Sequence, residues 1–334
     1  MQQKLKHFSA LDLVEGVQLG HAAAALLQLG VLDAMREPVV AEALSRTYKI
    51  DLEMLSGVLD FLSLRTDLIR KTRSGYATGK GYTGQTQFML SLYAGAYGKS
   101  ASQLGEILRR PSTAAAAINQ HAFTKAFSGA ATESVGTLPT LLRQLGFNHI
   151  LDIGCGAAAL LCAMGDADAT FVGWGIDQSA EMCRAARGSI RRAGIARRVK
   201  IFEGDAKNPL AAIPEHVRGK VRTITACNFC NELFRSDTSQ FVRWLRRIRK
   251  TWPGRMLVVS DYYGRLGHSI DLKLRETFLH DYVQVISGQG VPPPNAAGWN
   301  AAYSAVGCSF VHAIEDRGSS RFVHVVRLSE SIKK

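Results

Sequence analysis

A glycine turn after a buried strand is the strongest chemical signal in this sequence. A strand with one carboxylate, Asp152, leads into this turn in residues Ile150–Gly156 (ILDIGCG), and a helix follows. Gly154 and Gly156 have no Cβ, so their backbone can come close to a ligand. Two glycines alone are a weak signal, so the kind of ligand has to be inferred from other residues.

Two further carboxylates stand at the ends of the next two predicted strands. Asp177 comes about twenty residues past the glycine turn, where a carboxylate can accept hydrogen bonds from both ribose hydroxyls of a nucleoside. Asp205 follows the third strand and is joined to Ala206. Any one of these acids could simply cap a helix or a turn. Three acids at three successive strand ends favour a nucleoside site instead.

Candidate catalytic groups follow the fourth predicted strand. The segment carries Asn228, Asn231 and Glu232, and His280 precedes Asp281 on a predicted helix that could reach the same pocket. This set is rich in amides and poor in titratable groups, and an amide cannot act as a base. The neighbouring aromatic side chains suit a cationic ligand, which their ring faces attract.

A parallel sheet would bring these groups together. From Leu142 onward, strands alternate with helices, as is typical of a parallel sheet with helices on both faces. We expect strands at residues 149–153, 170–176, 199–203, 221–227, 255–261, 310–316 and 322–328, the last two as an antiparallel hairpin at the sheet edge. The predicted fold class is α/β, a Rossmann-like doubly wound sheet, preceded by an all-helical or winged-helix domain.

The N-terminal residues 1–82 indicate this smaller module. Helices are expected over residues 39–48 and 51–64, and a hairpin over residues 68–78, which is the order of a winged helix. In the second helix, one apolar side is expected from Met54, Leu55, Val58, Leu59 and Leu62. That helix has three acids and no Lys or Arg, which makes it a poor surface for phosphates and favours dimerisation over DNA binding.

The charge of the chain raises the question of a nucleic-acid partner. The chain has 334 residues, 41 of them Lys or Arg against 28 Asp or Glu, a net charge of +13. Residues 181–200 hold seven basic residues and one acid, and residues 241–255 hold six basic residues and no acid. These stretches follow the second and fourth strands, so crossover rules put their helices on opposite faces of the sheet. A single nucleic-acid groove is therefore disfavoured.

Composition limits the other classes of protein. The 46% hydrophobic content is that of a globular protein, and Asp12 and Glu15 interrupt the apolar start, so we expect neither a membrane span nor a signal peptide and predict a cytoplasmic protein. Six cysteines make no disulfide framework in a chain of this length. Cys227 and Cys230 have CxxC spacing without a second pair, so we interpret them as small strand-end residues rather than a metal or redox site.

On these motifs, residues 140–330 resemble class I S-adenosylmethionine (SAM)-dependent methyltransferases. With its N-terminal module, the whole chain resembles the winged-helix group that acts on small molecules. The resemblance implies a dimerisation domain (1–82), a helical linker and active-site cover (83–140, with Phe123–Phe127 near the acceptor), and a SAM-binding catalytic domain (141–334). It also implies that Asp152, Gly154 and Gly156 cradle the methionine part of SAM, Asp177 holds the ribose, Asp205 and Ala206 line the adenine, and Asn228 borders the cofactor.

Two positions depart from the family pattern. Its third glycine is Ala158 here, which would reshape the pocket around the amino-acid end of SAM. Asn231-Glu232 stands where related O-methyltransferases carry His-Asp, whose histidine is the general base. Methylation of a phenol with the usual base is therefore disfavoured. His280 could substitute, and some relatives bind a metal through such a His-Asp pair, but we expect no metal here.

These observations leave three functions open. The first is a homodimeric SAM-dependent methyltransferase for a small molecule of the secondary-metabolite type, without the usual histidine base. Because alignment carries much of a methyl transfer, a weak base can suffice for an amine or carbanion acceptor. The second is a SAM-consuming cyclase or lyase of the same fold, similar to azetidine-2-carboxylate synthases, which would release methylthioadenosine. An RNA methyltransferase or nucleic-acid-binding regulator is the third and least favoured.

Overall fold

The computed structural model describes residues 8–129, 136–235, 237–267, 274–316 and 318–329. The chain divides into two compact units, residues 1–130 and 131–334. The second unit thus begins ten residues before the expected catalytic domain, residues 141–334. Consequently the helices between residues 84 and 129 group with the N-terminal module, whereas helix α10 (Leu138–Gln144) groups with the sheet.

The first unit begins with the expected helices and hairpin. Helices α1 (Ala10–Gln28), α2 (Val31–Ala34), α3 (Ala41–Tyr48) and α4 (Leu52–Arg65) precede the antiparallel strands β1 (Ile69–Thr72) and β2 (Gly75–Thr78). Asp51 caps α4, because its side chain accepts the N–H of Met54 at 2.9 Å. The apolar side of α4 is narrower than predicted. Leu55, Leu59 and Leu62 are buried, but Met54 is 72% exposed, one position around the helix from that stripe.

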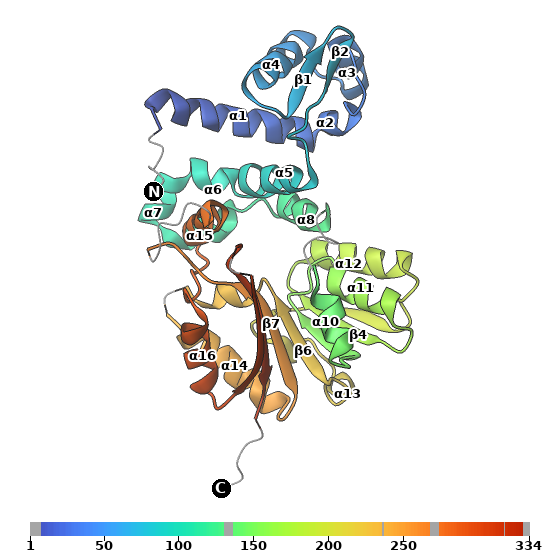
Figure 1. The fold of residues 1–334 in the computed structure, drawn as a ribbon, viewed down its shortest axis with the longest axis vertical. Coiled ribbons are helices and arrows are strands. Elements are labelled where there is room, and N and C mark those ends of the chain that lie inside the picture. Colours follow the sequence, from blue (N-terminus) through green and yellow to red (C-terminus); the bar gives the residue numbers. More distant parts are fainter. Residues whose placement is uncertain (1–7, 130–135, 236, 268–273, 317, 330–334) are drawn as a thin grey trace. The chain divides into compact units, whose positions relative to one another are not determined.

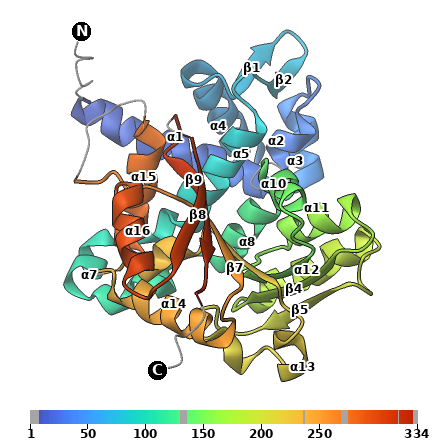
Figure 2. The same ribbon diagram turned by 60° about the horizontal axis from the view of Figure 1, so that its bottom comes forward.

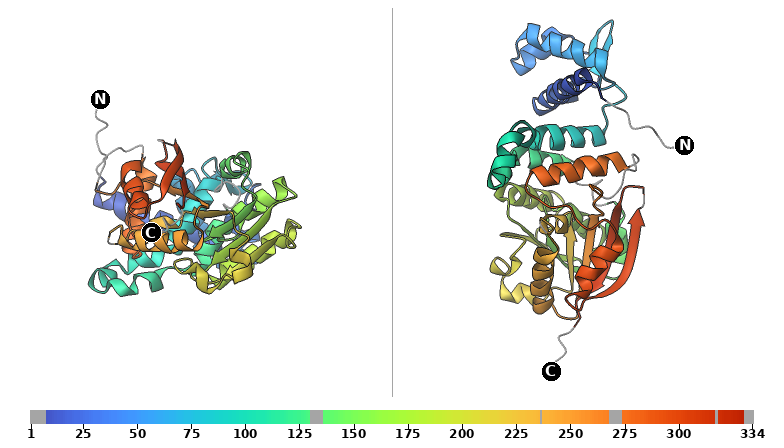
Figure 3. Two further views of the ribbon diagram at one scale, coloured as in Figure 1. Left: turned by 90° about the horizontal axis from the view of Figure 1, so that it is seen from below. Right: turned by 90° about the vertical axis from the view of Figure 1, so that its left-hand side faces the viewer.

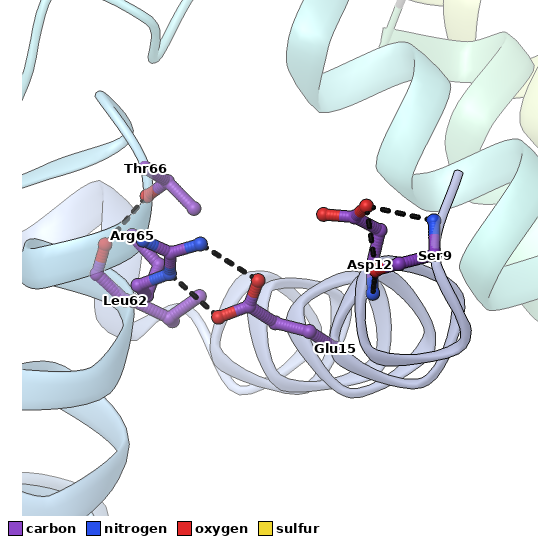
Figure 4. Close-up of polar contacts among 6 residues, drawn as sticks. All are labelled: Ser9, Asp12, Glu15, Leu62, Arg65 and Thr66. Carbon is purple, nitrogen blue, oxygen red and sulfur yellow. Dashed lines mark hydrogen bonds and ion pairs between the residues drawn. The ribbon is translucent and has the colours of Figure 1, made fainter. Parts of the chain in front are cut away.

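Helix α1 has a buried second half and an exposed first half. Its start is fixed by a capping box between Ser9 and Asp12, and Glu15 accepts two hydrogen bonds from Arg65 of α4, at 2.5 and 2.8 Å (Figure 4). Beyond these contacts Leu11, Val14 and Val17 are 75, 61 and 56% exposed. By length and composition alone α1 could cross a membrane, although the sequence predicted no span. One such helix near the N-terminus is a weak sign, since soluble helices pass the same test.

Short helices complete the first unit. They are α5 (Gly84–Met89), the π-helix η1 (Leu90–Ala96), α6 (Gly98–Ser102), α7 (Leu104–Arg109), the 3-10 helix η2 (Pro111–Ala117) and α8 (Gln120–Gly129). The predicted helical character of this region is confirmed. An aromatic cluster joins α5 to α8, with the ring of Phe127 centred 5.5 Å from Phe88 and 4.7 Å from Phe123.

The second unit is built on a seven-stranded sheet in the order β5-β4-β3-β6-β7-β9-β8 (Figure 2). Its strands are β3 (His149–Ile153), β4 (Val172–Asp177), β5 (Val199–Glu203), β6 (Thr223–Cys227), β7 (Met256–Tyr262), β8 (Ser309–Asp316) and β9 (Arg321–Arg327). All seven lie within two residues of their predicted bounds. The first five are parallel, and β8 and β9 form the predicted antiparallel hairpin at one edge (Figure 3).

Helices cover both faces of this sheet (Figure 1). On one face, α11 (Ala159–Ala167) and α12 (Ala180–Arg192) pack on Ile150 and Val258. On the other, α14 (Ser239–Thr251) and α16 (Ala296–Ser304) pack on Leu151 and Val259. The shorter η3 (Pro209–Ala211), α13 (Glu215–Arg218), η4 (Cys230–Leu233) and the longer α15 (Arg275–Ile286) complete the unit. The basic helices α12 and α14 thus lie on opposite faces, as predicted.

Candidate active site

The glycine turn lies where the strand order reverses. From β3 the chain order runs outward through β4 on one side and β6 on the other, and ligands of doubly wound sheets bind at such a switch point. Gly154 and Gly156 have φ angles of +73° and +51°, in the left-handed region that favours glycine. A Cβ on Gly156 would meet nothing within 4 Å among the described residues, so its surroundings leave room for a ligand.

Ala158, in place of the family's third glycine, also has a left-handed backbone. Its φ is +64°, and it caps the N-terminus of α11 without a side-chain hydrogen bond. A residue with a Cβ is strained in this region, by about 1 kcal/mol. The departure noted in the sequence therefore stores strain at the turn.

Asp152 is a buried carboxyl at this turn. It is 3% exposed and accepts the hydroxyl hydrogen of Thr225, its partner in the β3–β6 register, at 2.6 Å. Burial raises the pKa of Asp152 to about 7, against the lowering effect of the Thr225 hydrogen bond, and the nearby Asp177 charge raises it further. A buried carboxyl that still has unused lone pairs is suited to a cationic or hydrogen-donating ligand.

Asp177 ends β4 and holds the turn from the other side. Its Oδ2 accepts the N–H of Gly156 at 3.0 Å, and its Oδ1 accepts the N–H of Ser179 at 2.9 Å. Burial raises the pKa of Asp177 above its usual value, and these backbone N–H groups oppose the rise. Each carboxylate oxygen retains a further lone pair, so the ribose role implied by the resemblance is chemically available.

Asp205 and Ala206 lie beyond β5 at the edge of the turn region. Asp205 is exposed and accepts the N–H of Lys207 at 2.8 Å, so it shapes its own loop. Ala206 is buried, and its carbonyl accepts the indole N–H of Trp244 on α14 at 3.1 Å. The structure thus places the backbone of Ala206 firmly, while the side chain of Asp205 remains open to solvent.

The hydrogen-bond acceptors around the glycine turn fit SAM. The cradle combines the open space at Gly156 with two carboxyls, Asp152 and Asp177, that have lone pairs to spare for ammonium and hydroxyl donors. Among the described residues, no basic side chain acts on the pKa of either carboxyl.

The segment after β6 supplies the next polar groups. Asn228 has a left-handed φ of +50°, and its N–H donates to the Ser260 carbonyl at 2.8 Å. Asn231 is 3% exposed, and its backbone N–H donates to Asp261 at 3.0 Å. Among the described residues its side-chain oxygen has no hydrogen-bond partner.

Glu232 is the carboxylate of that segment. Its Oε1 accepts a hydrogen bond from the Gln289 amide at 3.1 Å. Burial raises the pKa of Glu232, Lys207 lowers it, and the charge of Asp177 raises it. The charge of Glu232 in turn raises the pKa of Asp261 in β7.

Two residues of this region escaped the sequence analysis. Asp261, 1% exposed in β7, accepts the N–H groups of Asn231 and Tyr262, and burial raises its pKa to about 7. Arg321 begins β9 opposite Tyr262, and its guanidinium donates to Asn228 Oδ1 at 2.8 Å. Asp261 could have been found as a fourth strand-end acid. Arg321 could not, because only the β7–β9 pairing brings it there.

His280 lies near the same strand ends. Its ring stands edge-on to Tyr262, with centroids 5.1 Å apart, and its Nε2 is 3.2 Å from the Gln284 amide nitrogen. Burial lowers the pKa of His280 to about 4, and the Arg321 charge lowers it further. His280 is therefore neutral at physiological pH and a weak base.

The adjacent Asp281 is used by the backbone. Its Oδ2 accepts the N–H groups of Arg265 and Leu266, at 2.5 and 2.9 Å, which ties α15 to the loop after β7. Among the described residues no cluster of three His, Cys, Asp or Glu side chains could hold a metal ion. Asp281 thus has a structural use that does not require a metal.

Cys227 and Cys230 are free thiols. Cys227 ends β6, as the strand-end interpretation predicted, and Cys230 is fully buried. Burial raises the pKa of both thiols well above the usual value, so neither forms the thiolate that redox or metal chemistry needs.

Gly290 provides a test of how closely the loop that carries Gln289 packs against the backbone after η4. A Cβ there would lie 2.1–2.3 Å from the backbone of Phe234 and Arg235, just after η4. We expect Gly290→Ala to destabilise the protein by about 1–3 kcal/mol and to displace Gln289 from Glu232. Gly219→Ala is the matched control, because its Cβ would meet nothing within 4 Å and its φ is −65°. Urea unfolding of both variants measures the effect, and equal stability would contradict this account.

Comparison with known proteins places this arrangement in a class. Residues 150–251 match the methyltransferase domain family. No curated protein sequence matches the chain. Among solved structures, the mitomycin 7-O-methyltransferase MmcR superposes with a TM-score of 0.72 at 18% identity, over 95% of this chain and 96% of that one. PigF with SAH gives 0.74 at 14% identity, over 97% and 100%. The N,N-8-amino-8-demethyl-D-riboflavin dimethyltransferase RosA of Streptomyces davawensis gives 0.62 at 18% identity, over 96% and 99%.

The fold is that of class I SAM-dependent methyltransferases with an N-terminal helical domain. Residues 150–251 are its methyltransferase domain. The predicted fold class, enzyme class and cofactor are confirmed at this level. The roles of individual site residues remain predictions.

Proposed function

We propose that this protein transfers the methyl group of SAM to a nucleophilic atom of a small molecule of the secondary-metabolite type. The observation that carries the proposal is the meeting of Asp152, the glycine turn and Asp177 at the switch point of the sheet. Solved structures of this fold are described as acting in mitomycin, pyocyanin and riboflavin-derivative chemistry, which supports a small acceptor. The basic helices α12 and α14 lie on opposite faces of the sheet, which disfavours a nucleic acid as the substrate.

The residues divide the chemical work. When bound, SAM supplies a methyl group made electrophilic by its sulfonium. Asp152 and Asp177 bind and orient the cofactor, and Asn228 borders it. A Cβ on Gly154 would lie 3.2 Å from the Cβ of Phe229, the residue that follows Asn228. Alignment of the acceptor with this methyl group supplies much of the acceleration.

Glu232 is the proposed proton acceptor in place of a histidine. Asn231 cannot take a proton, and His280, with a pKa of about 4, is a poor base that serves instead to position the acceptor. Burial raises the pKa of the Glu232 carboxylate above its usual value, which strengthens it as a base, and Gln289 orients it.

Incubation of the purified protein with SAM alone, then with a panel of amines, phenols and carbon acids, tests the proposal by mass spectrometry. S-adenosylhomocysteine that forms only with an acceptor supports methyl transfer. Methylthioadenosine formed without any acceptor would establish the cyclase or lyase alternative. Failure to bind SAM would exclude both.

We also propose a cytoplasmic homodimer formed through the N-terminal domain. The exposed apolar side chains of α1, with Leu11, Val14 and Val17 on the half that leaves the core, support an interface with a second copy. Val14→Glu should convert the dimer to a monomer in light scattering at micromolar concentration, because a charge would be buried in the interface. Val40→Glu, exposed on the same unit, is the control. A wild-type monomer would contradict the proposal.

A further inference from the structure

A polar corner joins α15 to the first residue of β9. It consists of Arg321, Asn228, Tyr262, His280 and Gln284. Residues opposite each other in an antiparallel pair point to the same side of the sheet, so Arg321 and Tyr262 share a face, and His280 packs edge-on against Tyr262. The charge of Arg321 adds to burial in lowering the pKa of His280.

Arg321 is held in place but not neutralised. Its NH1 group donates to Asn228 Oδ1 at 2.8 Å, and Asn228 adopts a left-handed backbone to present that oxygen. Among the described residues no carboxylate forms an ion pair with Arg321. A guanidinium has five N–H donors in a planar fork, so the remaining donors can bind a carboxylate in two-pronged fashion.

Gln284 offers a complementary group nearby. It is 4% exposed, and its amide nitrogen lies 3.2 Å from His280 Nε2. Its amide oxygen has no hydrogen-bond partner among the described residues. A buried acceptor without a partner costs free energy, and a ligand that donates a hydrogen bond to it would recover that cost.

The corner adjoins the cofactor cradle. Asn228 is followed directly by Phe229, whose Cβ and nearest ring atoms would lie 3.2–3.4 Å from a Cβ on Gly154. Asn228 thus links the residue beside the glycine turn to Arg321, and Arg321 is paired in register with Tyr262, against which His280 packs. A molecule held at this corner would be beside the methyl donor.

We propose that this corner selects the acceptor, which carries a carboxylate bound by Arg321 and, beside it, an N–H or O–H donor bound by the oxygen of Gln284. The substrate class is thus an amino- or hydroxy-carboxylic acid. This inference rests on the proposed function, since it names the acceptor of that same site.

Three matched probes test it by calorimetry on protein saturated with S-adenosylhomocysteine. 2-Aminobenzoate has both groups, benzoate lacks the donor, and 2-aminobenzamide lacks the charge. We expect 2-aminobenzoate to bind about tenfold or more tightly than either of the others. Arg321→Gln should remove the preference over 2-aminobenzamide, and Gln284→Met, of similar volume, should remove the preference over benzoate. Arg191→Gln, exposed on α12, should change neither.

The outcomes separate this inference from the proposed function. Binding of S-adenosylhomocysteine is measured first, and its absence would overturn both. If it binds but the three probes bind equally, or none binds saturably, only the acceptor class is overturned. Loss of a preference in both variants and the control alike would also overturn it, because the effect would then be general. Unchanged cofactor affinity and thermal midpoint in Arg321→Gln and Gln284→Met show that each variant is folded.

Discussion

Replacing Asp177 by alanine should weaken SAM binding by about two orders of magnitude, or about 3 kcal/mol. In the proposed ribose role, Asp177 would accept two charge-assisted hydrogen bonds that the substitution removes, each worth about 1.5–3 kcal/mol. The substitution also releases the N–H groups of Gly156 and Ser179, which Asp177 now holds at 3.0 and 2.9 Å, so the glycine turn loses its shape. Calorimetric titration with SAM or S-adenosylhomocysteine measures the effect.

Two matched variants separate the ribose contact from general damage. Asp177→Asn keeps one carbonyl oxygen and should bind SAM with intermediate affinity. Asp205→Ala removes an exposed carboxylate that only holds its own loop, so it should cost less than tenfold. Equal affinities of Asp177→Ala and the wild type would remove the ribose assignment.

The second large effect is expected at Asp152, where stability and binding should oppose each other. The pKa of Asp152 is raised from 3.8 to about 7 in the folded protein. Between pH 4 and 7 the folded state therefore binds more protons than the unfolded state, and the unfolding free energy falls as pH rises. Above pH 7 the accumulated loss is a few kcal/mol, since each pKa unit is worth about 1.4 kcal/mol.

Asp152→Asn should remove that loss in the protein without ligand. The amide oxygen can still accept the Thr225 hydroxyl hydrogen, and no charge is buried. We expect the variant and the wild type to be equally stable near pH 4 and the variant to be more stable by a few kcal/mol at pH 8. Urea unfolding at several pH values gives this difference. The comparison of variant with wild type is needed because two other groups also make stability depend on pH. Asp261, whose pKa is raised to about 7, makes the unfolding free energy fall as pH rises, whereas His324, whose pKa is lowered to about 4, makes it rise.

Binding should respond in the opposite direction. The ionised Asp152 attracts the cationic ammonium of SAM, so wild-type affinity should rise between pH 6 and 8, with proton release on binding. In Asp152→Asn the affinity should be lower by one to two orders of magnitude at pH 8 and should lose most of this pH dependence. Calorimetry in two buffers of different ionisation enthalpy counts the protons. An identical pH profile for both proteins would show that Asp152 does not face the cofactor.

The sheet and the cofactor half of the site could be predicted because their signals are local. Alternation of strands and helices marks each strand, and a short loop after each parallel strand keeps its carboxylate at the shared edge. For that reason Asp152, Gly154, Gly156 and Asp177 gather where the sequence predicted. The register then adds what spacing cannot show, such as the hydrogen bond from Thr225 to Asp152 across 73 positions.

By itself, the sequence determined the α/β class, the order of the elements and the acidic glycine turn, because each depends on neighbours along the chain. It also predicts that the usual histidine base is missing, since by the resemblance Asn231 stands at that place. The proposed acceptor side of the site, by contrast, depends on the tertiary structure. Arg321 reaches Asn228 over 93 positions through the antiparallel pairing of β9 with β7. Likewise, whether Glu232 or His280 can take a proton depends on burial and on charges from distant strands, which residue types alone do not specify.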